Sequence, residues 1–189
     1  MRSLFKRFIT TAFLFMLGFQ LALNSPTCIA KEERDFTLIS ADGPVSLHKM
    51  RGKVVMLFFG FTACPDVCPI SLLTIKQVLV QLNSDELKRA KAFFITLDPD
   101  RDTPELLKQY TGYFHPNISG LTEKPEKIAR IAKSYGVRYQ RNKLDGSALG
   151  YVIDHTSNIF LIDPSGRLKA SYPHNEDPDT ILAQIRGLL

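Results

Sequence analysis

The chain has 189 residues, 44% of them hydrophobic and 23% charged, which is enough for one domain with a substantial core. It contains no internal repeat, low-complexity tract or linker, which argues against a repeat array or several domains. The net charge of +5 includes Arg2, Lys6 and Arg7; without these three of the 24 basic residues, 21 remain against 19 acidic residues. Since no basic stripe is interleaved with aromatic residues, the sequence excludes a nucleic-acid partner.

The first 30 residues have the pattern of an export segment. A short basic stretch precedes an apolar run of 16 residues over 8–23, and small and polar residues follow it. This pattern predicts a signal peptide cleaved after Ala30 or an N-terminal membrane anchor, although 16 residues are short for a membrane span. The mature domain, residues 31–189, is therefore expected outside the cytoplasm, where free thiols need a reductant or a metal.

Apolar spacing and turn residues divide the mature domain into strands and helices. Asp42-Gly43 lies between two short apolar stretches and predicts a β-hairpin, whereas the continuous apolar run over 54–59 is typical of a buried strand. Asp102, followed by Pro104, is the predicted N-cap of a helix. In chain order the predicted elements are a hairpin over 35–47, a strand over 54–59, a helix over 69–82, a strand over 92–97, helices over 102–114 and 123–135, an extended stretch over 137–139, a loop over 142–150, a hairpin over 158–172 and a helix over 177–189. This order predicts an α/β protein with a mixed sheet.

Two cysteines lie between the strand over 54–59 and the helix over 69–82. Three residues separate Cys64 from Cys68, a spacing that allows the pair to close a disulfide or to reach one point together. The N–H groups at a helix N-terminus stabilise a thiolate and lower its pKa. A structural disulfide closing so short a loop adds only about 2 kcal/mol, a weak reason to place one in a chain with a real core. The other two interpretations of the pair are redox chemistry and the binding of a soft metal.

Among the four histidines, only His155 has a predicted place near the cysteines. A cysteine pair at the end of the first βα unit points to a thioredoxin-like fold, in which the segment 151–156 comes back over the cysteines as a loop. His155 is then either a metal ligand or an ordinary loop residue. His48, His115 and His174 are expected at the surface.

If His155 reaches the two cysteines, the three residues form a Cys2His set. Two thiolates and one imidazole suit Cu(I), and they suit Cu(II) with one further ligand. A structural zinc site would need a fourth protein ligand, and the sequence makes none evident. Asp66 and Asp154 lie beside these residues in the sequence and would either orient the ligands or cap the loops.

The stretch over 59–69, Phe-Gly-Phe-Thr-Ala-Cys-Pro-Asp-Val-Cys-Pro, resembles the signature of the SCO/SenC family of copper proteins. Further matches to the family occur over 95–105, over 120–122, over 154–156 and over 162–166. The resemblance covers residues 34–189, which is nearly the whole mature domain.

The resemblance implies a thioredoxin-like fold with a mixed central sheet flanked by helices, an N-terminal β-hairpin and a hairpin insertion. It implies that Cys64, Cys68 and His155 bind copper, as Cu(I) or Cu(II), in a metallochaperone rather than an enzyme. The expected partners are cytochrome c oxidase subunit II, or another copper-accepting protein, and a protein that reduces the thiols. The expected location is the periplasm or the outer face of the inner membrane, with residues 8–23 as the membrane contact.

The alternative function is a thiol–disulfide oxidoreductase that keeps the cysteines of its target reduced, with Cys64 and Cys68 as the redox-active pair. A peroxide-reducing enzyme of the same fold is a more distant third interpretation. Thioredoxin-type enzymes typically have two residues between their cysteines and a cis-proline opposite them. Here three residues separate the cysteines and no proline occurs between Tyr151 and Asp163, which favours metal binding.

Overall fold

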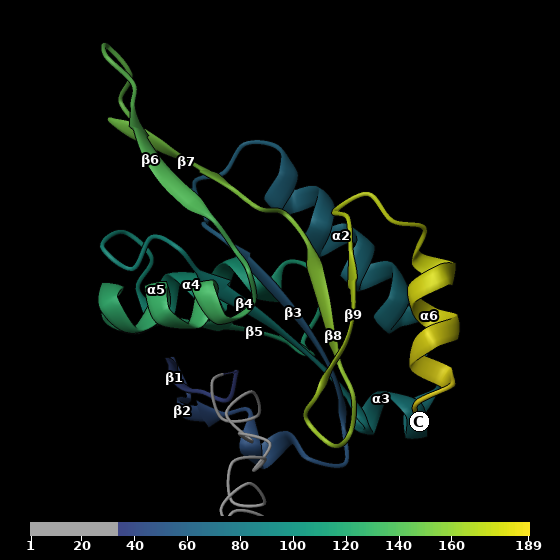
Figure 1. Cartoon of the computed structure of the whole chain (residues 1–189). Helices are drawn as coiled ribbons and strands as arrows, with labels where there is room; N and C mark the ends of the chain where they lie inside the picture. Colours follow the sequence, from purple (N-terminus) through teal and green to yellow (C-terminus); the bar gives the residue numbers. More distant parts are fainter. Residues whose placement is uncertain (1–33) are drawn as a thin grey trace, which may run out of the picture. The chain divides into compact units, whose positions relative to one another are not determined.

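The computed structural model describes residues 34–189 (Figure 1). The predicted export segment, residues 1–30, lies outside the described residues. Within the described range, none of the helices combines the length and the apolar character needed to cross a membrane.

A five-stranded sheet in the order β5-β4-β3-β8-β9 forms the centre of the described domain (Figure 1). Its strands are β3 (Val54–Gly60), β4 (Ala90–Thr96), β5 (Ile118–Leu121), β8 (Ile159–Ile162) and β9 (Leu168–Tyr172). β3 is parallel to β4 and antiparallel to β8, so the predicted mixed sheet is confirmed. All seven residues of β3 are buried, as expected for an apolar strand that is covered on both faces.

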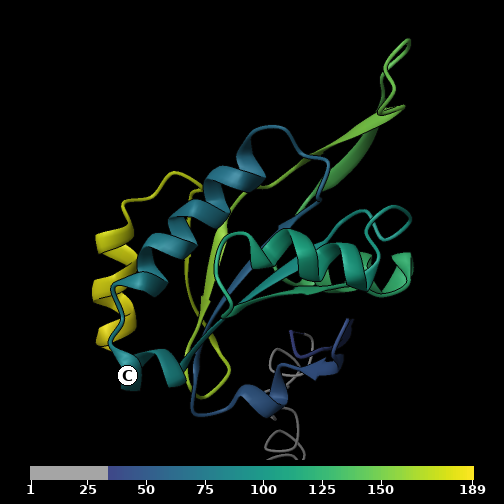
Figure 2. The ribbon, with the colours of Figure 1, turned by 180° about the vertical axis from the view of Figure 1, so that it is seen from behind.

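Helices cover both faces of this sheet. The helices of the described domain are the 3-10 helix η2 (His48–Met50) and the α-helices α2 (Val67–Val80), α3 (Ser84–Lys88), α4 (Pro104–Gly112), α5 (Pro125–Ser134) and α6 (Pro178–Arg186). α2 and α4 lie on one face (Figure 2), where Tyr110 packs on Phe94 with the ring centroids 5.5 Å apart. α5 lies on the opposite face (Figure 1), where its C-cap residue Tyr135 packs on Phe59 with the centroids 5.7 Å apart. α6 packs beside α2.

Two hairpins lie outside the central sheet. β1 (Thr37–Ser40) and β2 (Gly43–Ser46) confirm the predicted N-terminal hairpin. β6 (Tyr139–Lys143) and β7 (Tyr151–His155) form a second hairpin that extends away from the sheet in both views (Figures 1 and 2). The prediction of a loop over 151–156 is wrong, because most of that segment pairs with β6. Of β6 only Tyr139 was predicted as extended, since Tyr-Gln-Arg-Asn-Lys lacks alternating apolar residues. Asn142 and Lys143, predicted in a loop, belong to the strand.

Three predicted helix starts differ from the structure, and α5 begins at Pro125 rather than at residue 123. α2 begins at Val67, two residues before the predicted start at Pro69, and proline is tolerated there because N–H groups in a first turn have no helical partner. The N-cap of α4 is Thr103, whose Oγ1 accepts a hydrogen bond from the Leu106 N–H at 3.2 Å. The prediction of Asp102 as N-cap is therefore wrong, and its carboxylate makes other contacts.

The packing of β5 against α4 depends on Gly120, and we predict that Gly120→Ala destabilises the domain. A Cβ at Gly120 would lie 2.6 Å from Leu107 Cβ and 3.0 Å from the Leu107 carbonyl carbon, which cannot move without shifting α4. The free energy of unfolding should fall by about 1–3 kcal/mol, as in other overpacked cores.

Gly112→Ala is the matched control for this substitution, because a Cβ at the end of α4 would meet no atom within 4 Å. It should leave stability unchanged or raise it by up to about 1 kcal/mol through helix propensity. Urea unfolding of both variants measures the difference, and equal stabilities would contradict the close β5–α4 contact.

Candidate metal centre

The loop that carries the cysteines starts where β3 ends. Cys64 is half-buried, and Cys68, in the first turn of α2, is completely buried. The Cys64 N–H donates to the Phe61 carbonyl at 3.2 Å, which tightens the loop. Gly60 allows Cys68 to pack under the end of β3, because a Cβ there would lie 2.7 Å from the Cys68 Sγ.

His155, the last residue of β7, reaches the cysteines from the other side. Its Nε2 lies 3.5 Å from the Cys68 Sγ and its Nδ1 lies 3.0 Å from the Thr156 carbonyl oxygen. A carbonyl only accepts hydrogen bonds, so Nδ1 carries the proton and the Nε2 lone pair faces the sulfur. The ring stands edge-on to Phe58 and Phe61, at centroid distances of 6.1 and 6.0 Å.

The structure thus brings the three predicted ligands together. The two Sγ atoms and a ring nitrogen of His155 all lie within 4.8 Å of one another. Within residues 34–189, no fourth histidine, cysteine or carboxylate joins the group.

The environment of the pair favours one thiolate. The pKa of Cys64 is lowered from 9.0 to about 4, chiefly by a hydrogen bond from the Cys68 side chain, with further support from the Asp66 and Cys68 N–H groups. Burial opposes this shift but does not outweigh it. The pKa of Cys68 is raised, because its thiol hydrogen-bonds to Cys64 and because it is buried. The reduced pair therefore holds a thiolate at Cys64 and a proton at Cys68.

The other residues singled out in the sequence do not join the group. The side chain of Asp66 is exposed and makes no capping hydrogen bond to α2. Asp154 is exposed and accepts a hydrogen bond from Asn142 Nδ2 at 2.5 Å, across the hairpin. None of the remaining histidines of the described domain lies with the cysteines, namely His48, His115 and His174.

Two buried carboxylates beside the centre, Asp98 and Asp102, were not predicted as site residues, although both lie in the stretch 95–105 that matches the family. Asp102 bonds to Thr62, two residues before Cys64, and Asp98 bonds to Tyr151, at the start of β7. Both looked like ordinary turn and cap residues in the sequence Asp-Pro-Asp-Arg-Asp, because only tertiary contacts reveal their partners.

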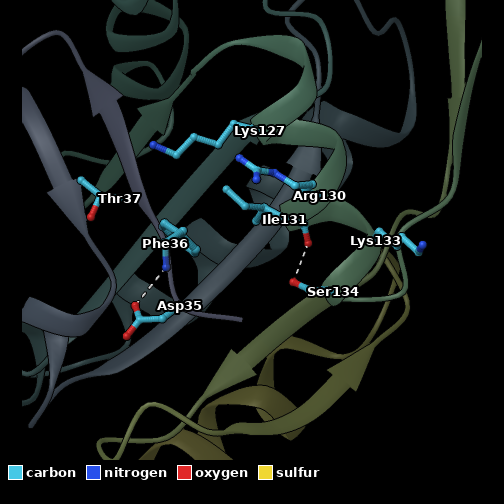
Figure 3. A pocket seen from close by; sticks show the side chains of 8 residues that line it. All are labelled: Asp35, Phe36, Thr37, Lys127, Arg130, Ile131, Lys133 and Ser134. Carbon is cyan, nitrogen blue, oxygen red and sulfur yellow. Dashed lines mark hydrogen bonds between the residues drawn. The ribbon is translucent and has the colours of Figure 1, made fainter. Parts of the chain in front are cut away.

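A cavity of about 840 Å³ lies elsewhere, between the start of β1 and α5 (Figure 3). Its lining residues are Asp35, Phe36, Thr37, Lys127, Arg130, Ile131, Lys133 and Ser134. It contains no cysteine or histidine, so the candidate chemistry of the thiols lies outside it.

Comparison with known proteins agrees with this fold. The family model SCO1/SenC matches residues 25–189. An SCO2-like protein of Rickettsia felis is 34% identical over 154 residues, which are 81% of this chain and 75% of the relative.

Two solved structures are similar over most of the chain. Apo Sco1 of Thermus thermophilus is 39% identical with a TM-score of 0.75, covering 83% of this chain and 91% of that protein. Bradyrhizobium japonicum ScoI with copper bound is 36% identical with a TM-score of 0.73, covering 82% of this chain and 98% of that protein. The chain therefore has a thioredoxin-like fold and belongs to the SCO1/SenC family.

Proposed function

We propose that this protein is an extracytoplasmic copper metallochaperone that binds copper through Cys64, Cys68 and His155 and assists assembly of the copper centre of cytochrome c oxidase. The observation that carries the proposal is the grouping of two sulfurs and one imidazole nitrogen within 4.8 Å. Copper is the cargo in this function, and the copper-bound structure of a relative at 36% identity supports the choice of metal.

The donor atoms fit a soft cation. Metal–sulfur and metal–nitrogen bonds of about 2.0–2.3 Å place two donors of one ion at most about 4.6 Å apart, so the group needs little contraction. Thiolates prefer Cu(I), whereas the imidazole adds a nitrogen that Cu(II) favours. Zinc fits less well, because no fourth donor joins the group among the described residues.

The protonation of the three residues prepares them for this role. Cys64 is already a thiolate, and the Nε2 of His155 offers a lone pair without losing a proton. Cys68 must release its proton, so loading of the cargo is coupled to the release of one proton from the pair. Oxidation to a disulfide would remove both thiolate donors.

The place of action and the partners follow from the same proposal. Residues 1–30 would export the domain or anchor it through 8–23, leaving 31–189 in the periplasm or at the outer face of the inner membrane. Cytochrome c oxidase subunit II or another copper-accepting protein would receive the cargo. Because disulfides form outside the cytoplasm, a thiol-reducing protein would return an oxidised pair to its binding form.

A thiol–disulfide oxidoreductase is the second candidate function. The observation that favours it is the lowered pKa of Cys64, which makes this half-buried residue a nucleophilic thiolate at neutral pH. The histidine distinguishes the two functions, because exchange between thiols does not need an imidazole lone pair directed at Cys68.

We predict that the reduced chain binds about one copper tightly and that the Cys64–Cys68 disulfide form binds none tightly, since ligation needs thiolates. Anaerobic titration with copper, using a competing chelator, measures both affinities. The double variant Cys64→Ser, Cys68→Ser is the control for binding elsewhere. Unchanged affinity after complete oxidation would refute the shared site.

We predict that His155→Ala lowers the affinity for Cu(II) more than that for Cu(I), because two thiolates still hold Cu(I). The loss of ring contacts with Phe58 and Phe61 should lower the stability of the metal-free protein by about 1 kcal/mol. Titration with each oxidation state and urea unfolding provide the measurements.

His174→Ala is the matched control for the histidine prediction, since His174 lies outside the group. If the His155→Ala variant binds Cu(II) with full affinity, His155 is not a ligand. Unchanged thiol–disulfide exchange in that variant, together with unchanged Cu(II) binding, would favour the oxidoreductase.

We predict that alkylation of Cys64 by iodoacetamide in the reduced, metal-free protein has its midpoint near pH 4, where the thiolate protonates. Above that pH the reactive thiolate persists, and below it the rate falls. Cys68→Ala removes the largest cause of the shift and should move the midpoint to higher pH. Equal midpoints in the two proteins would show that a hydrogen bond from Cys68 does not lower the pKa of Cys64.

A further inference from the structure

We propose that the turn between β4 and α4, residues 98–102, positions both halves of the metal centre. Asp102 holds the cysteine loop, and Asp98 holds the hairpin that carries His155. This inference rests on the proposed function, because the positioned residues matter as metal ligands. The hydrogen bonds that carry it are present without any metal. Asp98 and Asp102 are positioning residues, since neither belongs to the group of three donors.

Asp102 fixes the loop before Cys64 through three hydrogen bonds. Its Oδ2 accepts from the Thr62 N–H at 3.1 Å and from the Thr96 hydroxyl at 2.5 Å, while its Oδ1 accepts from the Thr62 hydroxyl at 2.5 Å. The residue is only 1% exposed, so water does not compete for the carboxylate. The loop is therefore held to the end of β4, two residues before Cys64.

Asp98 fixes the hairpin from the other end of the same turn. Its Oδ1 accepts from the Tyr151 hydroxyl at 2.6 Å and from Arg141 Nη2 at 3.1 Å, and its Oδ2 accepts from Arg101 Nε. The side chain is 1% exposed, and two guanidinium groups balance its buried charge. Arg101 also donates to the Tyr151 carbonyl at 3.3 Å and stacks 3.8 Å from the centre of its ring.

The turn connects these two anchor points rigidly. The Arg101 and Asp102 N–H groups donate to the Asp98 carbonyl at 3.1 and 2.9 Å. The Thr96 hydroxyl links the Asp102 carboxylate to the backbone of Asp98, because it donates to Asp102 Oδ2 and accepts from the Asp98 N–H at 2.9 Å. A movement at one anchor point therefore changes the other.

The hairpin needs such an anchor because β6 and β7 pair only with each other in the described sheets. Successive residues of a strand alternate between faces, so Tyr151, Ile153 and His155 share one face of β7. Ile153 is buried, which shows that this face is turned to the domain. Fixing Tyr151 and Arg141 therefore fixes the strand that ends in His155.

The test compares variants of the full reduced chain. Asp98→Asn leaves two guanidinium groups without their carboxylate, and Tyr151→Phe removes only one hydroxyl. Both should weaken Cu(II) binding by about 10- to 100-fold, the usual cost of losing a group that orients a ligand. Both should change the nitrogen signature in the electron paramagnetic resonance spectrum, while Cu(I) affinity changes by less than about threefold.

Thr62→Val tests the contact between Asp102 and the cysteine loop. It removes the hydrogen bond from the Thr62 hydroxyl to Asp102 and keeps the one from the Thr62 N–H. It should change the alkylation rate of Cys64 and the Cu(I) affinity while the nitrogen signature stays. If Thr62→Val and Tyr151→Phe affect the same quantities equally, the division of the turn into two anchor points is wrong.

Asp163→Asn is the matched control, since Asp163 is another buried turn carboxylate bonded to an arginine, between β8 and β9. Loss of the Asp163 carboxylate should lower the free energy of unfolding and leave copper affinity and the spectrum unchanged. If Asp98→Asn or Tyr151→Phe changes stability as this control does but leaves Cu(II) affinity and spectrum unchanged, the positioning role is refuted.

A metal-free measurement separates this inference from the proposed function. Hydrogen exchange of the β7 amides should be faster in Asp98→Asn and Tyr151→Phe than in Asp163→Asn, because the hairpin has lost its anchor. Faster exchange in a protein that binds no copper would reject the function and keep the anchor. Equal exchange in all three variants would reject the anchor itself.

Discussion

The candidate centre depends on the close approach between the end of β3 and the sulfur of Cys68. That sulfur occupies space next to Gly60 where any larger residue would place a Cβ. Because β3 is buried along its whole length, it cannot shift to make room. The first turn of α2 is therefore pressed against the sheet, Cys68 loses contact with water, and Cys64 is left as the accessible member of the pair.

Burial of Cys68 then determines the charge of the group. A buried thiol resists ionisation, so the negative charge of the reduced pair settles on Cys64, where N–H groups at the start of α2 also support it. His155 enters with its protonated nitrogen already committed to a backbone carbonyl, which leaves its other nitrogen directed at the sulfur. The surroundings thus set the charge of the two thiols and the direction of the imidazole lone pair before any ligand arrives.

The sequence predicted well what local patterns determine. The apolar run over 54–59 and the following cysteines gave the buried strand, the loop and the helix of the candidate centre, and the Asp-Gly turn gave the first hairpin. Most of β6 could not be predicted, because the strand has no alternating apolar face and its Arg141 is held by Asp98 and Asp100, which are distant in sequence. The role of Asp102 was equally hidden, since its partners Thr62 and Thr96 come from two other segments. The four-residue strand β5 depends on pairing with β4, which no short window reveals.

The contact between Cys68 and His155 spans 87 positions of the chain. Contacts this distant in sequence must close a long loop, so they form late, whereas two cysteines four positions apart meet once the short loop and the first turn of α2 have formed. A chain that emerges from a ribosome or a translocation channel with its N-terminus first exposes both thiols well before the histidine is available. The complete donor set therefore exists only once β7 has joined the segment that carries the cysteines. A chain in which β7 has not yet docked offers two thiols without the imidazole, so the imidazole distinguishes the folded site from the unfolded one.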